Sequence, residues 1–187
     1  PQASKPAWGR YQGKIIESIH LQQRGVFESA PSDTATNKPW KSLGRLLFPT
    51  TRSWAIRQYL CFNAGNRLDE TQLKNSQEAL NQLPYLEKAW IKVTPSPGSN
   101  DTVDVLVTTQ DAFPIKPGLV LERKILTLSH QNLAGLGHTL VNRFSYNQRL
   151  GYGLTYQIPN IQGSYITGEL QYLNTHEKQV KRLGMYR

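Results

Sequence analysis

The stretch that decides the fold is "YGLTYQIPNIQGSYITGELQYL", residues 152–173, in which apolar and polar side chains alternate. A period of two residues is typical of a β-strand with one apolar face and one polar face. The apolar positions are Tyr152, Leu154, Tyr156 and Ile158 before the "PNIQGS" break, and Ile166, Leu170 and Tyr172 after it. The stretch therefore predicts two neighbouring strands that share one apolar surface.

Composition argues against a helical membrane span. Hydrophobic residues make up 38% of the 187 residues, and the apolar runs are far shorter than the roughly 20 residues that a spanning helix needs. A β-barrel is compatible with this composition, because its alternating strands leave only a weak hydropathy signal. The net charge is +9, of which residues 114–187 carry +6. This basic half suits nucleic acid, an anionic membrane surface or acidic partners, or is a solvated basic face.

No catalytic or metal-binding constellation is visible in the sequence. The single cysteine, Cys61, cannot form an internal disulfide, and we interpret it as a buried apolar residue. The four histidines are scattered without the spacing of a metal site, and no serine lies in a G-x-S-x-G elbow. We therefore expect no enzymatic activity, no cofactor and no metal.

The first half of the chain mixes strand and helix patterns. "GKIIESIHL" (13–21) predicts a strand, and the aperiodic stretch 22–46 predicts a long loop. A helix is expected after the Thr50–Thr51 pair, either of which can cap it, and a second helix begins at Asp69, a good N-cap residue. Two further strands, "KAWIKVTP" and "TVDVLVTT", are joined by a short turn and predict an antiparallel hairpin. We assign to the core Leu73, Leu80, Ile91, Val103, Val105 and Val107.

The second half contains only strand patterns separated by short Gly/Asn turns. We expect strands near 119–129, 137–147, 150–158, 164–174 and 178–187. About five strands are fewer than the roughly eight of the smallest closed barrels. The sequence therefore predicts an antiparallel meander that is an incomplete part of a barrel.

The stretch "FPTTRSWAIRQYLCFNAGNRLDETQLKNSQEALNQLPYLEKAWIKV" (48–93) resembles a POTRA domain, the periplasmic polypeptide-transport-associated repeat. The matching positions are Arg57, Leu60, Phe62, Gly65, Leu80, Leu83, Tyr85, Ala89, Ile91 and Val93. "HQNLAGLGHTL" (130–140) is similar to an Asn-Leu-x-Gly-x-Gly segment near the first barrel strand of the BamA/TamA outer-membrane assembly superfamily, also called the bacterial surface antigen family. Residues 152–173 resemble an early transmembrane hairpin of that family.

The resemblance implies an α+β fold class: a POTRA-like β-α-α-β-β module followed by an antiparallel β-meander that is an incomplete part of a transmembrane β-barrel. The expected domains are an irregular lead-in at 1–12, a periplasmic POTRA-like domain at 13–112 and the start of the barrel at 113–187. Asp111, at the end of the module, is expected to tie it to the barrel mouth.

Two surfaces follow from the resemblance. The seven apolar residues of the opening stretch are expected to face lipid, with the opposite face lining a lumen. An exposed strand edge offers unpaired N–H and C=O groups, to which an extended polypeptide adds as a further strand. By resemblance this edge is the strand Lys88, Ala89, Trp90, Ile91, Lys92 and Val93. A plainer interpretation is that Trp90 packs under the loop 22–46.

The implied function is an outer-membrane protein assembly or translocation component, with the module in the periplasm and the barrel in the bacterial outer membrane. Its expected partners are unfolded outer-membrane or secreted polypeptides, outer-membrane lipid, and periplasmic or lipoprotein accessory subunits. Nucleic acid is not expected, because "NAGN" (63–66) lacks the G-x-x-G clamp of a KH module. The alternatives are a transporter of the two-partner secretion kind and a barrel anchor of a separate enzyme domain.

Overall fold

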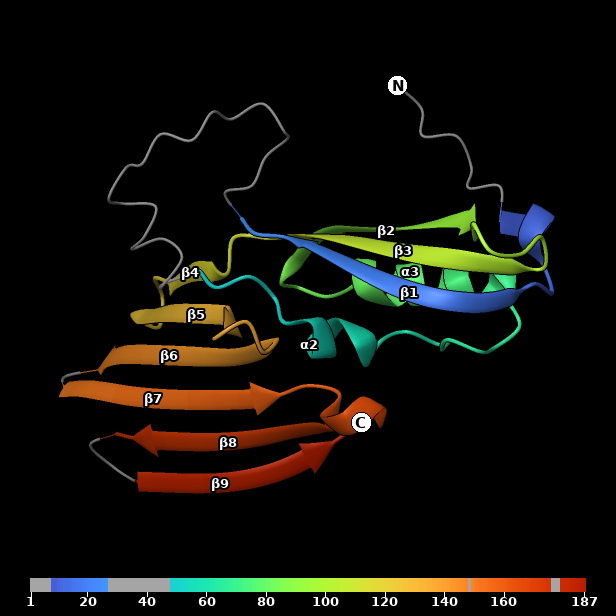
Figure 1. Ribbon diagram of the computed structural model, residues 1–187. Coiled ribbons are helices and arrows are strands. Elements are labelled where there is room, and N and C mark those ends of the chain that lie inside the picture. Colours follow the sequence, from blue (N-terminus) through green and yellow to red (C-terminus); the bar gives the residue numbers. More distant parts are fainter. Residues whose placement is uncertain (1–7, 27–47, 148, 176–178) are drawn as a thin grey trace, which may run out of the picture. The chain divides into compact units, whose positions relative to one another are not determined.

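Strands dominate the computed structural model of the protein (Figure 1). They occupy 52% of the described residues, and helices occupy 16%. Among these residues no helix has the length and apolarity needed to cross a membrane. The structure describes residues 8–26, 48–147, 149–175 and 179–187.

The chain divides into two compact units, and each unit combines two separate segments. Unit 1 comprises Pro1–Ser29 and Tyr59–Ala112. Unit 2 comprises Ala30–Gln58 and Phe113–Arg187. The segment just before Tyr59 therefore belongs with the C-terminal half of the chain.

Unit 1 contains a three-stranded sheet, the 3₁₀-helix η1 (Trp8–Tyr11) and the helix α3 (Glu70–Asn81). The strands are β1 (Ile15–Arg24), β2 (Leu86–Pro95) and β3 (Thr102–Asp111), in the order β1-β3-β2. β1 runs parallel to β3, and β2 runs antiparallel to it. The predicted hairpin of the last two strands is confirmed.

The core of unit 1 lies between this sheet and α3 (Figure 1). α3 begins where expected, because the Asp69 side chain accepts a hydrogen bond from the Thr71 N–H at 3.1 Å. The six predicted core residues are all buried: Leu73, Leu80, Ile91, Val103, Val105 and Val107. Alternation along β3 sends every second side chain to the helix-covered face, which excludes water from it.

Unit 2 contains the short helix α2 (Ser53–Arg57), the 3₁₀-helix η2 (Ile161–Gly163) and a six-stranded sheet. Each strand pairs antiparallel with the next one along the chain. The strands are β4 (Ile115–Val120), β5 (Ile125–Leu133), β6 (His138–Asn147), β7 (Arg149–Ile158), β8 (Thr167–Asn174) and β9 (Gln179–Tyr186).

The predicted fold class is wrong, because the chain is mostly β with two sheets rather than an α+β chain built on a β-α-α-β-β module. The expected first helix shortens to α2, which has five residues and belongs to unit 2. Unit 1 therefore contains one α-helix, α3, in its described part. Apolar spacing around Trp54 and Ile56 fits a helix, but propensity is a weak prior that tertiary contacts override.

Three smaller predictions also need correction. The strand expected at 119–129 is two strands, because a charged turn at Leu121–Lys124 separates β4 from β5 and makes six strands instead of five. The residue before α2 that acts as its N-cap is Arg52, not a threonine. Cys61 is exposed rather than buried. Residues 27–47, most of the expected loop, lie outside the described residues.

Candidate functional site

The six-stranded sheet of unit 2 has one apolar face. Residues directly opposite each other on paired antiparallel strands share a face, so the pairing register defines its membership. One row across four strands, for example, is Leu140, Tyr156, Leu170 and Leu183. The apolar face comprises Leu119, Leu126, Leu128, Leu140, Phe144, Tyr152, Leu154, Tyr156, Ile158, Leu170, Tyr172, Leu183 and Met185.

This face is exposed within unit 2. Leu126 is 48% accessible, Leu170 54% and Leu183 76%. Contiguous exposed apolar surface on this scale marks contact with a membrane or a partner, since a soluble monomer rarely exposes so much of it. Large apolar side chains on this face extend from β4 to β9, and its polar members include Asn142, opposite Leu154, and Lys181, opposite Tyr172.

The opposite face of the same sheet is mostly polar, although Ile125, Val141, Leu173 and Val180 also lie on it. The Gln157 side-chain amide donates to the Glu169 carboxylate at 2.8 Å and to the Tyr186 hydroxyl at 3.2 Å. Thr155 and Gln171 are direct neighbours on this face. An apolar face and a hydrogen-bonded polar face on the same strands are the arrangement of a transmembrane barrel wall.

Six of the seven predicted lipid-facing residues lie together on the apolar face, in β7 and β8. The exception is Ile166, which precedes the first residue of β8 and accepts a hydrogen bond from the Ile161 N–H at 2.9 Å. Ile166 therefore belongs to the turn, because the strand begins three residues later than its expected start at 164. Contact of this face with lipid stays a prediction.

Sequence reasoning missed the other half of this face. β5 and β6 contribute Leu126, Leu128 and Phe144, and β9 contributes Leu183 and Met185. The alternation of Leu126 and Leu128 with Thr127 was a visible signal. It was hidden because one strand was expected where β4, a turn and β5 occur.

The predicted polypeptide-binding strand, β2, lies at an edge of the unit 1 sheet. Ala89 and Ile91 direct their main-chain N–H and C=O groups away from β3, because side chains outside the sheet form hydrogen bonds with these groups. The Asn81 side chain accepts from the Ala89 N–H at 2.7 Å and donates to the Ala89 carbonyl at 3.1 Å. The Gln77 side chain accepts from the Ile91 N–H at 2.9 Å, and the Trp8 indole donates to the Ile91 carbonyl at 3.2 Å.

We refer to Trp8, Gln77 and Asn81 as the edge cap. A side-chain amide carries the same donor and acceptor as a peptide group, so Asn81 contacts Ala89 as a neighbouring strand would. Edge strands in native proteins are commonly covered in this way to prevent uncontrolled pairing. The cap could not be read from the sequence, because its members lie on η1 and α3 and reach β2 only through the packing of separate elements.

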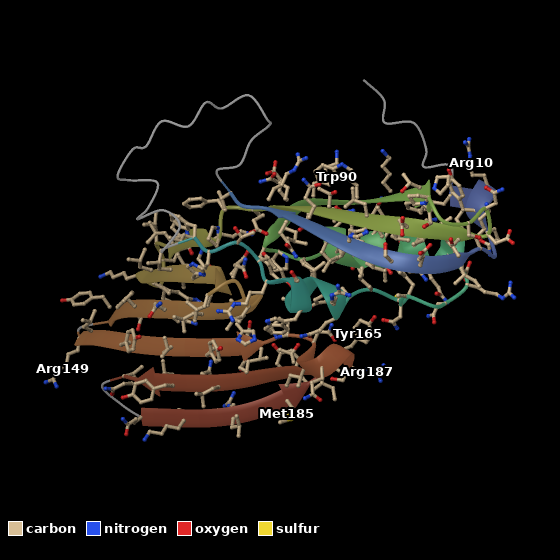
Figure 2. All side chains as sticks on the ribbon, in the orientation of Figure 1. Arg10, Trp90, Arg149, Tyr165, Met185 and Arg187 are labelled. Carbon is tan, nitrogen blue, oxygen red and sulfur yellow. The ribbon has the colours of Figure 1, made fainter. Side chains whose placement is uncertain are left out.

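Three residues of the predicted edge, Lys88, Trp90 and Lys92, point to the sheet face away from α3. Figure 2 shows Trp90 there, 39% exposed, and the Lys88 ammonium lies 5.6 Å from the centre of its ring. Lys92 is exposed on the same parity, and Val93 is buried. Whether Trp90 packs under the loop 22–46 concerns residues that are mostly outside the described part.

The second edge of the unit 1 sheet is β1, and the main-chain groups at the start of this strand are covered by another segment. The Ile16 N–H donates to the Asn66 carbonyl at 2.9 Å, and the Ile16 carbonyl accepts from the Gly65 N–H at 2.8 Å. Beyond a bulge after Ile16, the pairing register with β3 turns the main-chain groups of Ile19 and Leu21 outward. Neither residue has a hydrogen-bond partner on that side among the residues that the structure describes.

Ser18, His20 and Asp104 form a cluster on unit 1 that resembles a catalytic triad in composition only. Ser18 bonds to both the Asp104 carboxylate and the His20 ring. In a working triad the carboxylate orients the histidine, whereas here it binds the serine. No group of three metal-binding side chains occurs in the described ranges.

Asp111, which was expected to tie the module to the barrel, is buried in unit 1. Burial of Tyr85 raises the pKa of its hydroxyl, and the nearby charge of Asp111 raises this pKa further.

Two buried asparagines in unit 2, both missed by sequence reasoning, hold the segment 48–58 against turns of the sheet. The Asn132 amide donates to the Thr51 hydroxyl at 2.7 Å, and its carbonyl accepts from the Gly137 N–H at 2.8 Å. The Asn160 amide donates to the Gln58 carbonyl at 3.3 Å. We refer to Asn132 and Asn160 as the turn clamps.

The turn between β5 and β6 explains the Asn-Leu-x-Gly-x-Gly pattern. Gly135 has a φ of +72°, and a Cβ there would lie 2.4 Å from the Thr50 carbonyl oxygen. That oxygen belongs to the clamped segment, whose Arg52 N–H also donates to the Gly135 carbonyl at 2.8 Å. His138, at the start of β6, packs edge-on against Trp54 and Tyr156. The pattern thus encodes a turn that receives another segment at close range.

The fold is shared with an outer-membrane β-barrel protein. A crystal structure of BamA from Haemophilus ducreyi lacking POTRA domains 1–3 matches 92% of this chain with a TM-score of 0.61 and 12% sequence identity. The chain spans 31% of the length of that structure. It is also similar to CdiB from Acinetobacter baumannii over 87% of this chain and 28% of that chain, with a TM-score of 0.48 and 13% identity. No family model and no curated protein matches the sequence.

Proposed function

We propose that the protein is a component of an outer-membrane protein assembly or translocation machine. Unit 2 forms part of a β-barrel wall in the outer membrane, and unit 1 receives extended polypeptide on the periplasmic side. The observation that carries the membrane assignment is the apolar face, which crosses all six strands of a sheet whose other face is mostly polar. The shared fold with BamA supports the same assignment.

The orientation of the sheet in lipid can be tested by chemical labelling. Single cysteines at Leu154 and Thr155, in a Cys61→Ser background, point to opposite faces of β7. In lipid vesicles we expect a charged, water-soluble maleimide to modify the cysteine at Thr155 and to spare the one at Leu154. Both should react in denaturant, which is the internal control. Equal reaction at the two positions in vesicles would contradict the membrane assignment.

We further propose that unfolded outer-membrane or secreted polypeptide pairs with β2 by displacing the edge cap. The chemistry supports this, because a strand that replaces Asn81 and Gln77 makes hydrogen bonds of the same kind to Ala89 and Ile91. The exposed Trp90 adds apolar contact beside that edge. The partners are recognised by main chain rather than by particular side chains, which suits a machine with many clients.

Removal of the cap amides is expected to strengthen polypeptide binding. Gln77→Ala with Asn81→Ala abolishes three hydrogen bonds that an incoming strand must otherwise break, each with a net contribution of about 1 kcal/mol. We expect binding to be about a hundredfold tighter, measured by fluorescence anisotropy with a labelled peptide of the β7 sequence (Arg149–Ile158). Asn75→Ala, on an exposed position of the same helix, is the matched control. Unchanged affinity would exclude β2 as the edge to which the polypeptide adds. The open half of the β1 edge would then be the remaining candidate in unit 1.

A further inference from the structure

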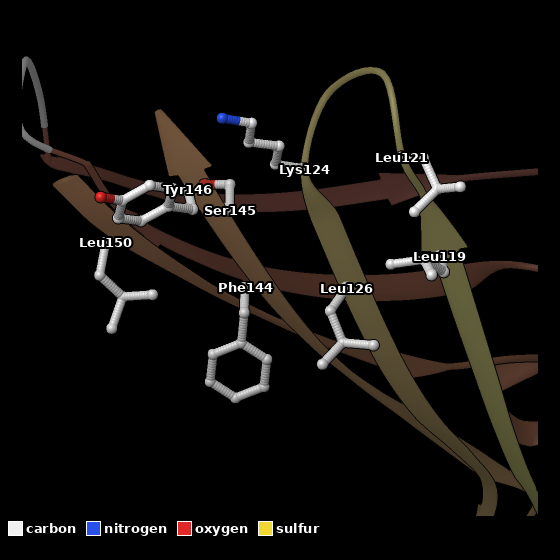
Figure 3. Close-up of a pocket in the computed structure, with 8 residues that line it drawn as sticks. All are labelled: Leu119, Leu121, Lys124, Leu126, Phe144, Ser145, Tyr146 and Leu150. Carbon is white, nitrogen blue, oxygen red and sulfur yellow. The ribbon is translucent and has the colours of Figure 1, made fainter. Parts of the chain in front are cut away.

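The apolar face contains a hollow at one end of the sheet. The turn between β4 and β5 lies beside the end of β6, where the Tyr146 N–H donates to the Lys124 carbonyl, and the hollow there has a volume of about 350 Å³. Figure 3 shows Leu126, Phe144 and Leu150 extending from the strands at the hollow, with Lys124 in the β4–β5 turn and Tyr146 near the end of β6. Its lining is Leu119, Leu121, Lys124, Leu126, Phe144, Ser145, Tyr146 and Leu150.

The single charged group of this lining is held in place by its own turn. Lys124 has a φ of +49°, its N–H donates to the Leu121 carbonyl at 3.0 Å, and its carbonyl accepts from the Tyr146 N–H at 3.0 Å. The ammonium lies 5.7 Å from the centre of the Tyr146 ring. The cation and the aromatic ring therefore stand together at the rim of an apolar surface, the arrangement found where lipid tails meet head groups.

This end of the sheet has unpaired positive charge. Arg123 and Lys124 lie in the β4–β5 turn, and neither forms an ion pair with any residue in the described part of the chain. The same turn contains one acidic residue, Glu122, which is exposed and likewise unpaired among those residues. The turn thus retains a net positive charge beside the hollow, and an anionic group can occupy the place of the missing partner.

We propose that the hollow binds an anionic membrane lipid that carries phosphate, with its acyl chain against Leu126, Phe144 and Leu150 and its phosphate at Lys124 and Arg123. The inference rests on the proposed membrane location of unit 2. The apolar lining selects a hydrocarbon chain, and the rim selects negative charge at one end of that chain. An uncharged lipid fills the hollow equally well but leaves the two cations without a counter-charge.

Native mass spectrometry of the purified protein, released from nanodiscs, tests the site. The nanodiscs contain an equal mixture of phosphatidylglycerol and phosphatidylcholine. We expect the protein to retain phosphatidylglycerol in preference to phosphatidylcholine, and Lys124→Gln to reduce that preference about fivefold. Lys124→Arg should restore it, because the charge returns. Lys116→Gln is the matched control, since it removes the same charge from the polar face of β4.

The outcomes separate the lipid site from the membrane assignment. A protein that enters the nanodiscs and retains both lipids equally overturns the lipid site and leaves the membrane location intact. Equal losses in Lys124→Gln and Lys116→Gln also overturn it, because the effect is then one of net charge. A protein that does not enter nanodiscs overturns both proposals.

Discussion

Replacement of Leu154 with arginine is expected to destabilise the protein in lipid by about 2–4 kcal/mol. Leu154 lies in the middle of β7 on the apolar face, opposite Asn142 on β6 and Tyr172 on β8. If this face contacts the hydrocarbon core, the guanidinium must either lose its hydration or thin the bilayer around it. Equilibrium unfolding by urea in phospholipid vesicles measures the loss.

Thr155→Arg is the control for this substitution. It places the same side chain one residue further along β7, on the polar face opposite Val141 and Gln171. We expect its effect to be below about 1 kcal/mol, because the lumen side of a barrel wall is in water. Similar losses for Leu154→Arg and Thr155→Arg would mean that the two faces have similar surroundings, and the proposed membrane location would then fail.

Asn132→Ala is expected to release the segment 48–58 from the sheet of unit 2. Asn132 is 4% exposed, and its side chain forms one hydrogen bond with the Thr51 hydroxyl and one with the Gly137 N–H. Alanine therefore leaves the buried Gly137 N–H and the Thr51 hydroxyl without this partner. Each buried group left unsatisfied costs about 1–3 kcal/mol, and we expect a total loss of about 2–4 kcal/mol. Trypsin should then cut faster after Arg52, the N-cap residue of α2, and after Arg57, its last residue.

Asn142→Ala is the matched control for the turn clamp. The Asn142 carbonyl accepts from the Tyr152 hydroxyl at 3.0 Å on the apolar face, so this variant loses a side-chain hydrogen bond without touching the clamped segment. We expect its trypsin cleavage at Arg52 and Arg57 to match that of the unsubstituted protein. Faster cleavage in both variants would show general loosening of unit 2, and normal cleavage in Asn132→Ala would show that other contacts hold α2.

The sequence predicted most strands because their patterns are local. Period-two alternation is set by the pleat, so β2, β3 and β7 could be located from residue order alone. The same locality made the helix after Thr50 a poor prediction. Its apolar residues fit a helical period, yet only the five residues of α2 are helical. The main-chain groups on either side of α2 form hydrogen bonds with the β5–β6 and β7–β8 turns instead.

For both the apolar face of unit 2 and the β2 edge of unit 1, the sequence determined one part of the site and the tertiary structure determined the rest. The sequence by itself determined which side chains of β7 share a face, since parity along a strand needs no knowledge of its neighbours. Only the tertiary structure decided that the face extends from β4 to β9, because pairing register aligns the rows. Only it showed that Ala89 and Ile91 are covered by Trp8, Gln77 and Asn81, because hydrogen bonds between separate elements depend on how those elements pack and leave no periodic pattern in the sequence.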